Sequence, residues 1–151
     1  LKLWSKIKIV AGQEVVMLRV KVIARGEPDT LPLVRIFSYQ TKSDEEIFFA
    51  GSDIIQKKVQ KNQKINVNEA LTLYCVYLVG QVRNGAAVNT LVEGARNILS
   101  ADNVMIGVPE TLHSIIFKLS VDNMPVQKIT LVDPIAPGSQ SLVAGKPMGR
   151  K

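Results

Sequence analysis

The sequence predicts an α+β domain in which a small antiparallel β-sheet packs against two or three helices. Residues 1–10 and 15–25 alternate apolar and polar side chains, and so do residues 113–121 and 126–132, which is the period of half-exposed strands. Between these two candidate hairpins, apolar residues recur at helical spacing. Strand pairs on both sides of a helical middle favour helices packed on one antiparallel sheet.

Length and composition indicate one folded domain. With 151 residues, of which 46% are hydrophobic and 21% charged, the chain can bury a core and is not disordered as a whole. We expect a single domain over residues 1–132. Residues 133–151, rich in Pro, Gly and Ser, predict a flexible tail or an arm that becomes ordered against a neighbour. No segment is apolar for long enough to cross a bilayer and no signal peptide opens the chain, while the leucine at position 1 predicts that the natural start lies upstream.

The first hairpin is predicted to have a basic outer face. Its two strands are joined by the turn AGQE at residues 11–14, and the lysines and arginines alternate with the apolar residues that face inward. The outward cations are Lys6, Lys8, Arg19 and Lys21. Residues 1–64 hold 12 Lys and Arg against 7 Asp and Glu, so this part of the chain favours an anionic partner.

Helices are predicted in the middle of the chain. Thr30 and Pro32 are typical of a helix start, and Leu33, Ile36 and Phe37 would then share one face. SDEE at residues 43–46 has the spacing of a capping box before a second apolar stripe, which Gly51 would interrupt or kink.

Two further helices follow in the sequence. Residues 68–85 predict a helix that Asn68 caps and Asn-Gly ends, although residues 71–79 alone also fit a buried strand. A shorter helix is expected over residues 90–100.

A cluster of four lysines, Lys57, Lys58, Lys61 and Lys64, ends the helix that begins near residue 43. One reading is a solvated helix end whose cations complement the helix dipole. The other is a docking patch for phosphates, because Lys57, Lys61 and Lys64 share one helical face and repel one another. Near an anionic membrane each lysine contributes about 1 kcal/mol, so the cluster would contribute roughly 4 kcal/mol, enough only when many copies act together.

The residues that usually carry catalysis are nearly absent. His113 is the only histidine, and Cys75 lies in an apolar segment where a thiol is usually buried and inert. The sequence contains no phosphate-binding glycine loop, no nucleophile elbow, and no spacing of a zinc or calcium site. We therefore predict no catalytic residue, no metal, no cofactor and no small-molecule substrate, and keep an enzyme that uses Cys75 or His113 as a third alternative.

The positive charge of the chain favours nucleic-acid binding, but the sequence has few aromatic residues on which bases could stack. Aromatic residues make up only 5% of the chain, and Trp4, between Lys2 and Lys6, is the one candidate for stacking on a base. Trp4 also fits the packing of an N-terminal strand. Non-specific contact with phosphates stays open.

Residues 20–51 resemble the matrix proteins of rhabdoviruses. The matching residues are Val20, Lys21, Val22, Arg35, Ile36, Lys42, Ser43, Glu46, Ile47 and Gly51. The order of elements is similar to that family from about residue 7 to residue 121, and the short chain resembles the plant-infecting members. The family's basic N-terminal tail with proline-rich budding motifs is absent from this sequence.

The resemblance implies a structural protein of the virion that lines the inner face of the viral envelope, with host cytoplasm, nucleus or membranes as its location in the cell. Its implied partners are other copies of itself, the viral nucleoprotein–RNA complex, an anionic membrane surface and the tail of an envelope glycoprotein. The lysine cluster and the basic hairpin face would bind membrane or phosphate. Self-association would use Leu3, Trp4, Leu142 and Val143. The alternative is an RNA-binding coat or nucleocapsid subunit.

Overall fold

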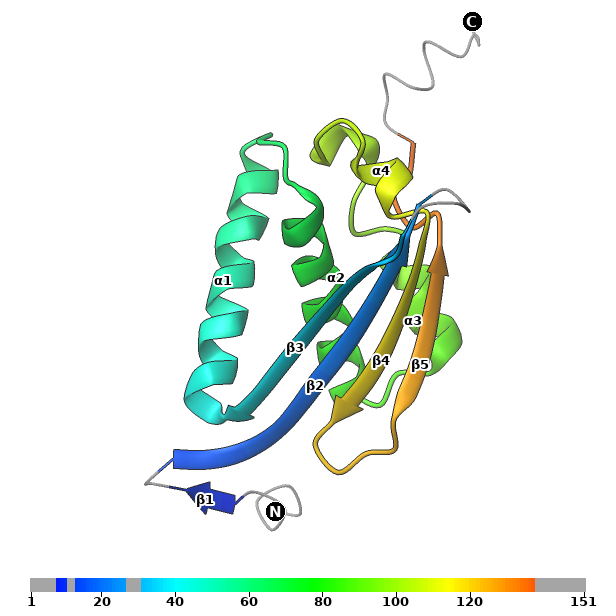
Figure 1. The fold of residues 1–151 in the computed structure, drawn as a ribbon. Helices are drawn as coiled ribbons and strands as arrows, with labels where there is room; N and C mark the ends of the chain where they lie inside the picture. Colours follow the sequence, from blue (N-terminus) through cyan, green and yellow to red (C-terminus); the bar gives the residue numbers. More distant parts are fainter. Residues whose placement is uncertain (1–7, 11–12, 27–30, 138–151) are drawn as a thin grey trace, which may run out of the picture.

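The structure, a computed structural model, describes residues 8–10, 13–26 and 31–137 (Figure 1). Its elements, in chain order, are β1 (Lys8–Val10), β2 (Gln13–Arg25), β3 (Leu33–Thr41), α1 (Lys42–Gln60), α2 (Val67–Arg83), α3 (Val88–Ala95), the 3-10 turn η2 (Ala101–Asn103), α4 (Val108–Thr111), β4 (Ser114–Val121) and β5 (Gln127–Val132). The predicted α+β class is confirmed: an antiparallel sheet packs against helices. None of the helices in the described ranges is both long and apolar enough to span a membrane.

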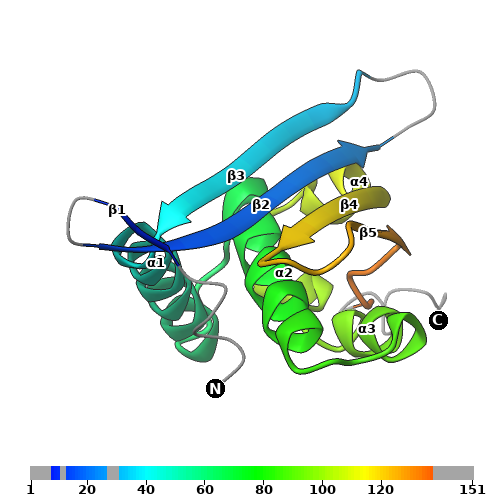
Figure 2. The ribbon, with the colours of Figure 1, turned by 90° about the horizontal axis from the view of Figure 1, so that it is seen from below.

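The sheet is built around β2, the longest strand. β2 pairs with β1, β3 and β4, and β5 adds to the far side of β4, always in antiparallel register. Leu18, Val20 and Val22 alternate with outward residues and are buried, as expected of a sheet with one covered face. Helices α1, α2 and α3 lie on that one side, and the other face of the sheet carries no helix from this group (Figure 2).

Both predicted hairpins are present. Lys8–Val10 pairs with the start of β2, and β4 pairs with β5 from Ser114 opposite Val132 to Leu119 opposite Gln127. For β4 and β5, and for β2 from Met17 onward, one face is buried, which explains why alternation was a usable signal there.

The helix predicted from Thr30 and Pro32 is wrong, because Leu33–Thr41 forms strand β3. The edge of β2 offers a row of backbone partners, and β3 pairs with it from Leu33 opposite Ala24 to Tyr39 opposite Leu18. A buried edge needs such partners, and this requirement overrides the local helical spacing of three apolar residues. Phe37 and Tyr39 then face inward, where their rings lie 5.5 and 4.9 Å from that of Phe48 on α1.

The helices differ from the predictions mainly at their ends. Thr41 caps α1 by accepting a hydrogen bond from the Asp44 amide at 3.2 Å, and α1 runs through Gly51 without interruption. Asn66 caps α2 in a reciprocal capping box with Glu69, two residues before the predicted cap. Residues 71–79 are helical, which excludes the alternative of a buried strand, and α3 is shorter and earlier than the helix expected over 90–100.

The first residues of the predicted tail pack on the domain. Ile135 is buried, and Ala136 forms a bridge with Ser100 through two backbone hydrogen bonds that involve Leu99 and Ala101. The remainder of the predicted tail lies outside the described residues. The division into a domain over 1–132 and a tail over 133–151 stays a prediction.

Candidate functional site

An apolar pair on the loop between η2 and α4 is the most exposed hydrophobic feature at that end of the molecule. Ile106 is fully exposed and Met105 is about half exposed, at 47% of its full surface. Both belong to the lining of a surface groove of about 570 Å³, together with Lys64, Ala101, Asp102, Val104, Gly107, Pro109 and Glu110. Large apolar side chains that a folded chain leaves in water mark surfaces that another molecule can cover.

The loop that carries this pair is held firmly. The Met105 amide donates to the Ile65 carbonyl at 2.9 Å, and the Ile65 amide donates to the Asn103 carbonyl at 3.0 Å. Val104 directly before the exposed pair is buried, as are its bridge partner Ile65 and Val108 just after the pair, so the backbone on either side is anchored at the core. The pair is therefore presented in one arrangement, which reduces the entropy lost on binding.

Turn residues explain why the chain leaves the core at this point. Ser100 begins η2 with a capping box that it shares with Asn103. Gly107 has a φ of 92°, a left-handed conformation that glycine adopts without strain, and Pro109 sits in the first turn of α4. This surface was not predicted, although the sequence carries a signal for it: two apolar residues directly before a Gly-x-Pro turn have no strand or helix to bury them.

The lysine cluster at the end of α1 is divided by the fold. Lys58 pairs with Glu69 of α2 at 2.6 Å, and the Lys64 ammonium donates to the carbonyl of Asp102. Lys57 and Lys61 are exposed and have no ion-pair partner in the part of the chain that the structure describes. Two of the four lysines thus have structural contacts, and binding of phosphate by the cluster stays a prediction.

The structure describes only some of the other predicted binding residues. Arg19 and Lys21 lie on β2 and face away from the helices, as expected, because the residues that alternate with them are buried. Lys8 lies in β1. Lys6 and the predicted self-association residues lie outside the described residues: Leu3, Trp4, Leu142 and Val143.

Cys75 and His113, the two candidates for catalysis, do not form a catalytic pair. Cys75 on α2 is fully buried, and burial raises the pKa of its thiol. His113 is exposed and lies 2.5 Å from Asp133, with Nδ1 facing the carboxylate. In the described ranges, no group of three or more His, Cys, Asp and Glu side chains is arranged to hold a metal ion.

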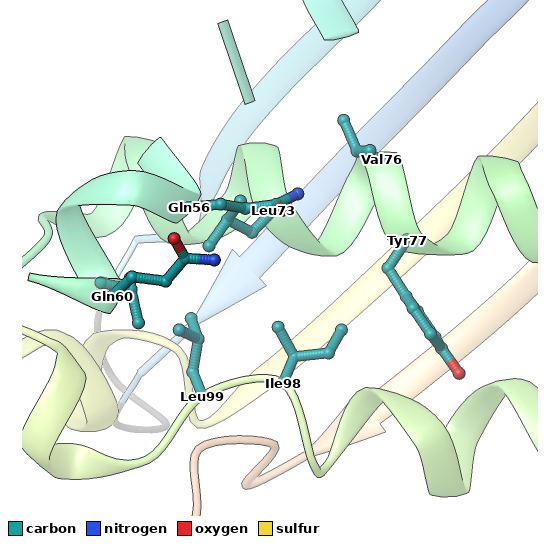
Figure 3. Close-up of a pocket in the computed structure, with 8 residues that line it drawn as sticks. Gln56, Gln60, Leu73, Val76, Tyr77, Ile98 and Leu99 are labelled. Carbon is teal, nitrogen blue, oxygen red and sulfur yellow. The ribbon is translucent and has the colours of Figure 1, made fainter. Parts of the chain in front are cut away.

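A second groove, of about 340 Å³, lies between α1, α2 and the loop after α3 (Figure 3). Leu73, Val76 and Tyr77 form its wall on α2, and Ile98 lies across from them. A Cβ atom at Gly94 would come within 1.8 Å of the Tyr77 hydroxyl oxygen, so glycine leaves the space that this ring occupies. The groove is mostly apolar, and we assign no ligand to it.

A partly buried ion triad joins three elements that lie far apart in the sequence. The guanidinium of Arg83, at the end of α2, donates to both carboxylate oxygens of Glu45 on α1 and to those of Asp122 in the turn after β4. Glu45 is only 1% exposed. The hydrogen bond to Glu45 is the largest cause that raises the pKa of Arg83, so this residue keeps its charge and holds both carboxylates. In the sequence, Glu45 fits the acidic start of a capped helix, and no local pattern points to the triad.

The helical layer and the second hairpin match a known family. A family model described as "Urease, gamma subunit" matches residues 39–135. The urease subunit gamma of Halalkalibacterium halodurans is 28% identical over 92 residues, which cover 60% of this chain and 91% of that protein. That of Shewanella halifaxensis is 30% identical over 74 residues, covering 49% of this chain and 74% of that protein.

These matches overturn the resemblance to rhabdovirus matrix proteins. That resemblance depended on a short motif in residues 20–51 and on element order, which many small α+β domains share, whereas the family match runs from the end of β3 to beyond β5. The expected matrix or RNA-coat function and virion location are therefore wrong. The expected partners, namely a viral nucleoprotein–RNA complex, an envelope glycoprotein tail and an anionic membrane, are wrong as well.

The prediction that the chain has no part in an enzyme is also wrong, since the matched family consists of subunits of an enzyme. The match covers well over half of the sequence, including every described helix and the β4–β5 hairpin. This chain belongs to the urease gamma subunit family.

Proposed function

We propose that this chain is a subunit of a urease, in which it assembles with the other urease subunits and supports the hydrolysis of urea by the assembled enzyme. One observation carries the proposal: the family match extends over residues 39–135, a range that contains α1 to β5. All described helices and the β4–β5 hairpin are thus shared with the family, and the relatives are named as gamma subunits of urease.

The rigid loop with Met105 and Ile106 is the surface that we assign to subunit contact. Its apolar side chains are exposed in the single chain and are held in place by the buried residues Ile65 and Val104. Apolar anchors that enter a pocket on a partner commonly dominate the free energy of association.

The experiment is co-expression of the tagged chain with the other urease subunits of its own source. We expect these subunits to co-purify with the chain, and omission of the chain should lower urea hydrolysis. Ile106→Glu places a charge at the centre of the proposed contact and should weaken assembly by about 30-fold, the equivalent of one interface hot spot of about 2 kcal/mol.

Val126→Glu is the matched control. Val126 is also exposed, at 66%, but lies in the connection between β4 and β5, at the other end of the sheet from α4 (Figure 1). Equal loss of assembly in both variants would contradict the assignment to the loop. If the unmodified chain neither co-purifies with the subunits nor affects hydrolysis, the proposed function is wrong.

A further inference from the structure

Three lysines stand opposite one another on the face of the sheet that α1, α2 and α3 do not cover. Lys21 of β2 is the register partner of Lys118 of β4, and Lys118 is the partner of Lys128 of β5. The neighbours that alternate with them, including Val20, Phe117 and Ile129, are buried, so the three lysines point to the opposite side of the sheet. Lys118 and Lys128 are exposed. Lys21 is half-buried, because β2 lies between β3 and β4.

Among the outward strand positions whose side chains the structure describes, no negative charge balances this row of lysines. From residue 17 onward, the outward positions of β2 to β5 contain no Asp or Glu, and Arg19 adds another cation two residues before Lys21. Within the described ranges, none of these four cations forms an ion pair or a side-chain hydrogen bond. Like charges directly opposite each other across a sheet destabilise it, so the row lowers the stability of the single chain.

An apolar row lies next to the lysines. It begins two residues from the lysines on each strand, where Ile23 of β2 pairs with Val34 of β3 and with Ile116 of β4. In the lysine row itself, the position on β3 opposite Lys21 is Ile36. By strand geometry the two rows are about 7 Å apart, and neighbouring lysines are about 5 Å apart at their Cα atoms. Charge beside apolar surface, in a regular array, resembles the composition of a protein interface.

Most of this face comes from a part of the chain that precedes the family match. β2 and the first six of the nine residues of β3 precede residue 39, whereas β4 and β5 fall within the matched range. The two relatives are proteins of about 100 residues, since 92 residues make up 91% of one and 74 residues make up 74% of the other. Lys118 and Lys128 oppose each other within the matched range, and Lys21 joins their row only because β2 pairs with the edge of β4.

Charge and shape favour a protein as the occupant. Carboxylates on successive turns of a helix are about 6 Å apart, close to the spacing of the lysines, and apolar residues beside them would cover Ile23 and Ile116. A nucleic acid would leave that apolar row uncovered, and the outward positions of β2 to β5 from residue 17 onward contain no aromatic side chain on which a base could stack.

We propose that the outer face of the sheet, centred on Lys21, Lys118 and Lys128, docks an acidic, partly apolar surface of another subunit of the urease. This inference rests on the proposed function and adds a second contact to the loop with Ile106. Carboxylates of the partner would relieve the repulsion in the row, so the charges that destabilise the single chain would stabilise the assembly.

The test compares two triple variants with the same change in charge. Lys21→Gln, Lys118→Gln and Lys128→Gln remove the row, while Lys42→Gln, Lys57→Gln and Lys61→Gln remove three exposed lysines of α1 and its end. Both are assayed by affinity for the co-expressed urease subunits at low and high salt. The row variant should bind about tenfold more weakly at low salt and lose most of its salt dependence, because three ion pairs of modest strength are lost.

The Tm of the row variant shows whether weaker assembly comes from a lost contact or from a destabilised fold. Since the substitutions remove repulsion, the Tm of the row variant alone should equal or exceed that of the unmodified chain. Weaker assembly together with an unchanged or higher Tm supports the proposal. A lower Tm, or an equal loss of affinity in the α1 variant, overturns it.

The remaining outcomes distinguish this inference from the proposed function. If the unmodified chain assembles and the row variant assembles equally well with the same salt dependence, only the inference about the sheet face is overturned. If the unmodified chain does not assemble at all, both fall. If a DNA duplex binds the unmodified chain at physiological salt and not the row variant, while assembly is unaffected, the face binds nucleic acid and the proposal is wrong.

Discussion

Replacing Arg83 by methionine should destabilise this protein more than any exposed substitution, because it leaves a carboxylate buried without a partner. Arg83 contacts both oxygens of Glu45, with the second at 2.9 Å from Nη2, and both oxygens of Asp122 at 3.1 and 3.2 Å. The Glu45 side chain is 2% exposed and that of Asp122 is 19% exposed, so water can compensate Asp122 far better than Glu45.

The size of the effect follows from the burial of Glu45. Removing one partner of a buried ion pair costs about 3–5 kcal/mol, whereas the total stability of a domain of this size is about 5–15 kcal/mol. Arg83→Met should therefore lower the free energy of unfolding by about 3 kcal/mol or more. The loss would be felt in α1, α2 and the β4–β5 connection together, because the triad joins these three elements.

Chemical denaturation of the single chain, followed by circular dichroism, measures this free energy. The variant Glu45→Leu combined with Arg83→Met is the control, since apolar residues of similar size commonly replace a buried ion pair at little cost. We expect the double variant to recover most of the stability that Arg83→Met loses. A loss below about 1 kcal/mol for Arg83→Met, typical of an exposed pair, would refute this reasoning. So would a double variant whose loss equals the sum of the two single losses.

Two further outcomes are expected. The hydroxyl of Tyr74 is buried and has no hydrogen-bond partner within the described residues, so Tyr74→Phe should raise the free energy of unfolding by about 1 kcal/mol; a loss of stability in the same denaturation assay would show that the hydroxyl is satisfied. Burial alone would raise the pKa of Glu69, but hydrogen bonds from Lys58 and the Asn66 amide lower it overall. A carboxylate with a lowered pKa stabilises the fold above its ordinary pKa, and this stabilisation is lost as the pH falls through the lowered value. Glu69→Gln should therefore reduce Tm at neutral pH and have progressively less effect in acid, and a constant difference from pH 7 to pH 3 would contradict the assignment.

Local patterns were sufficient for the elements that bury one face against their immediate neighbours. Both hairpins follow from alternation, and α1 and α2 follow from apolar spacing, although their caps are Thr41 and Asn66, each two residues before the predicted cap. β3 was missed because Leu33, Ile36 and Phe37 fit a helix as well as a strand. The partner that decides between the two is the free edge of β2, which is a property of the assembled sheet.

The two candidate contact surfaces could likewise be predicted only in part from local sequence patterns. The outward direction of Lys118 and Lys128 could be read from the alternation of the predicted hairpin, and the exposure of Ile106 from the turn that follows it. Family identity could not be recovered from charge and element order, because both are shared by many unrelated domains. A short motif shared with a viral family gave the wrong family, whereas the match over residues 39–135 identifies the right one.

The sequence by itself determined the α+β class, the two hairpins and the excess of positive charge in the N-terminal part, since periodicity and composition are properties of neighbouring residues. Only the tertiary structure decided that Lys58 is bound to Glu69, that Arg83 reaches two carboxylates 38 and 39 residues away, and that lysines from three strands form one row. Such contacts depend on strand register and helix packing, which bring together residues whose separation along the chain gives no signal of their proximity.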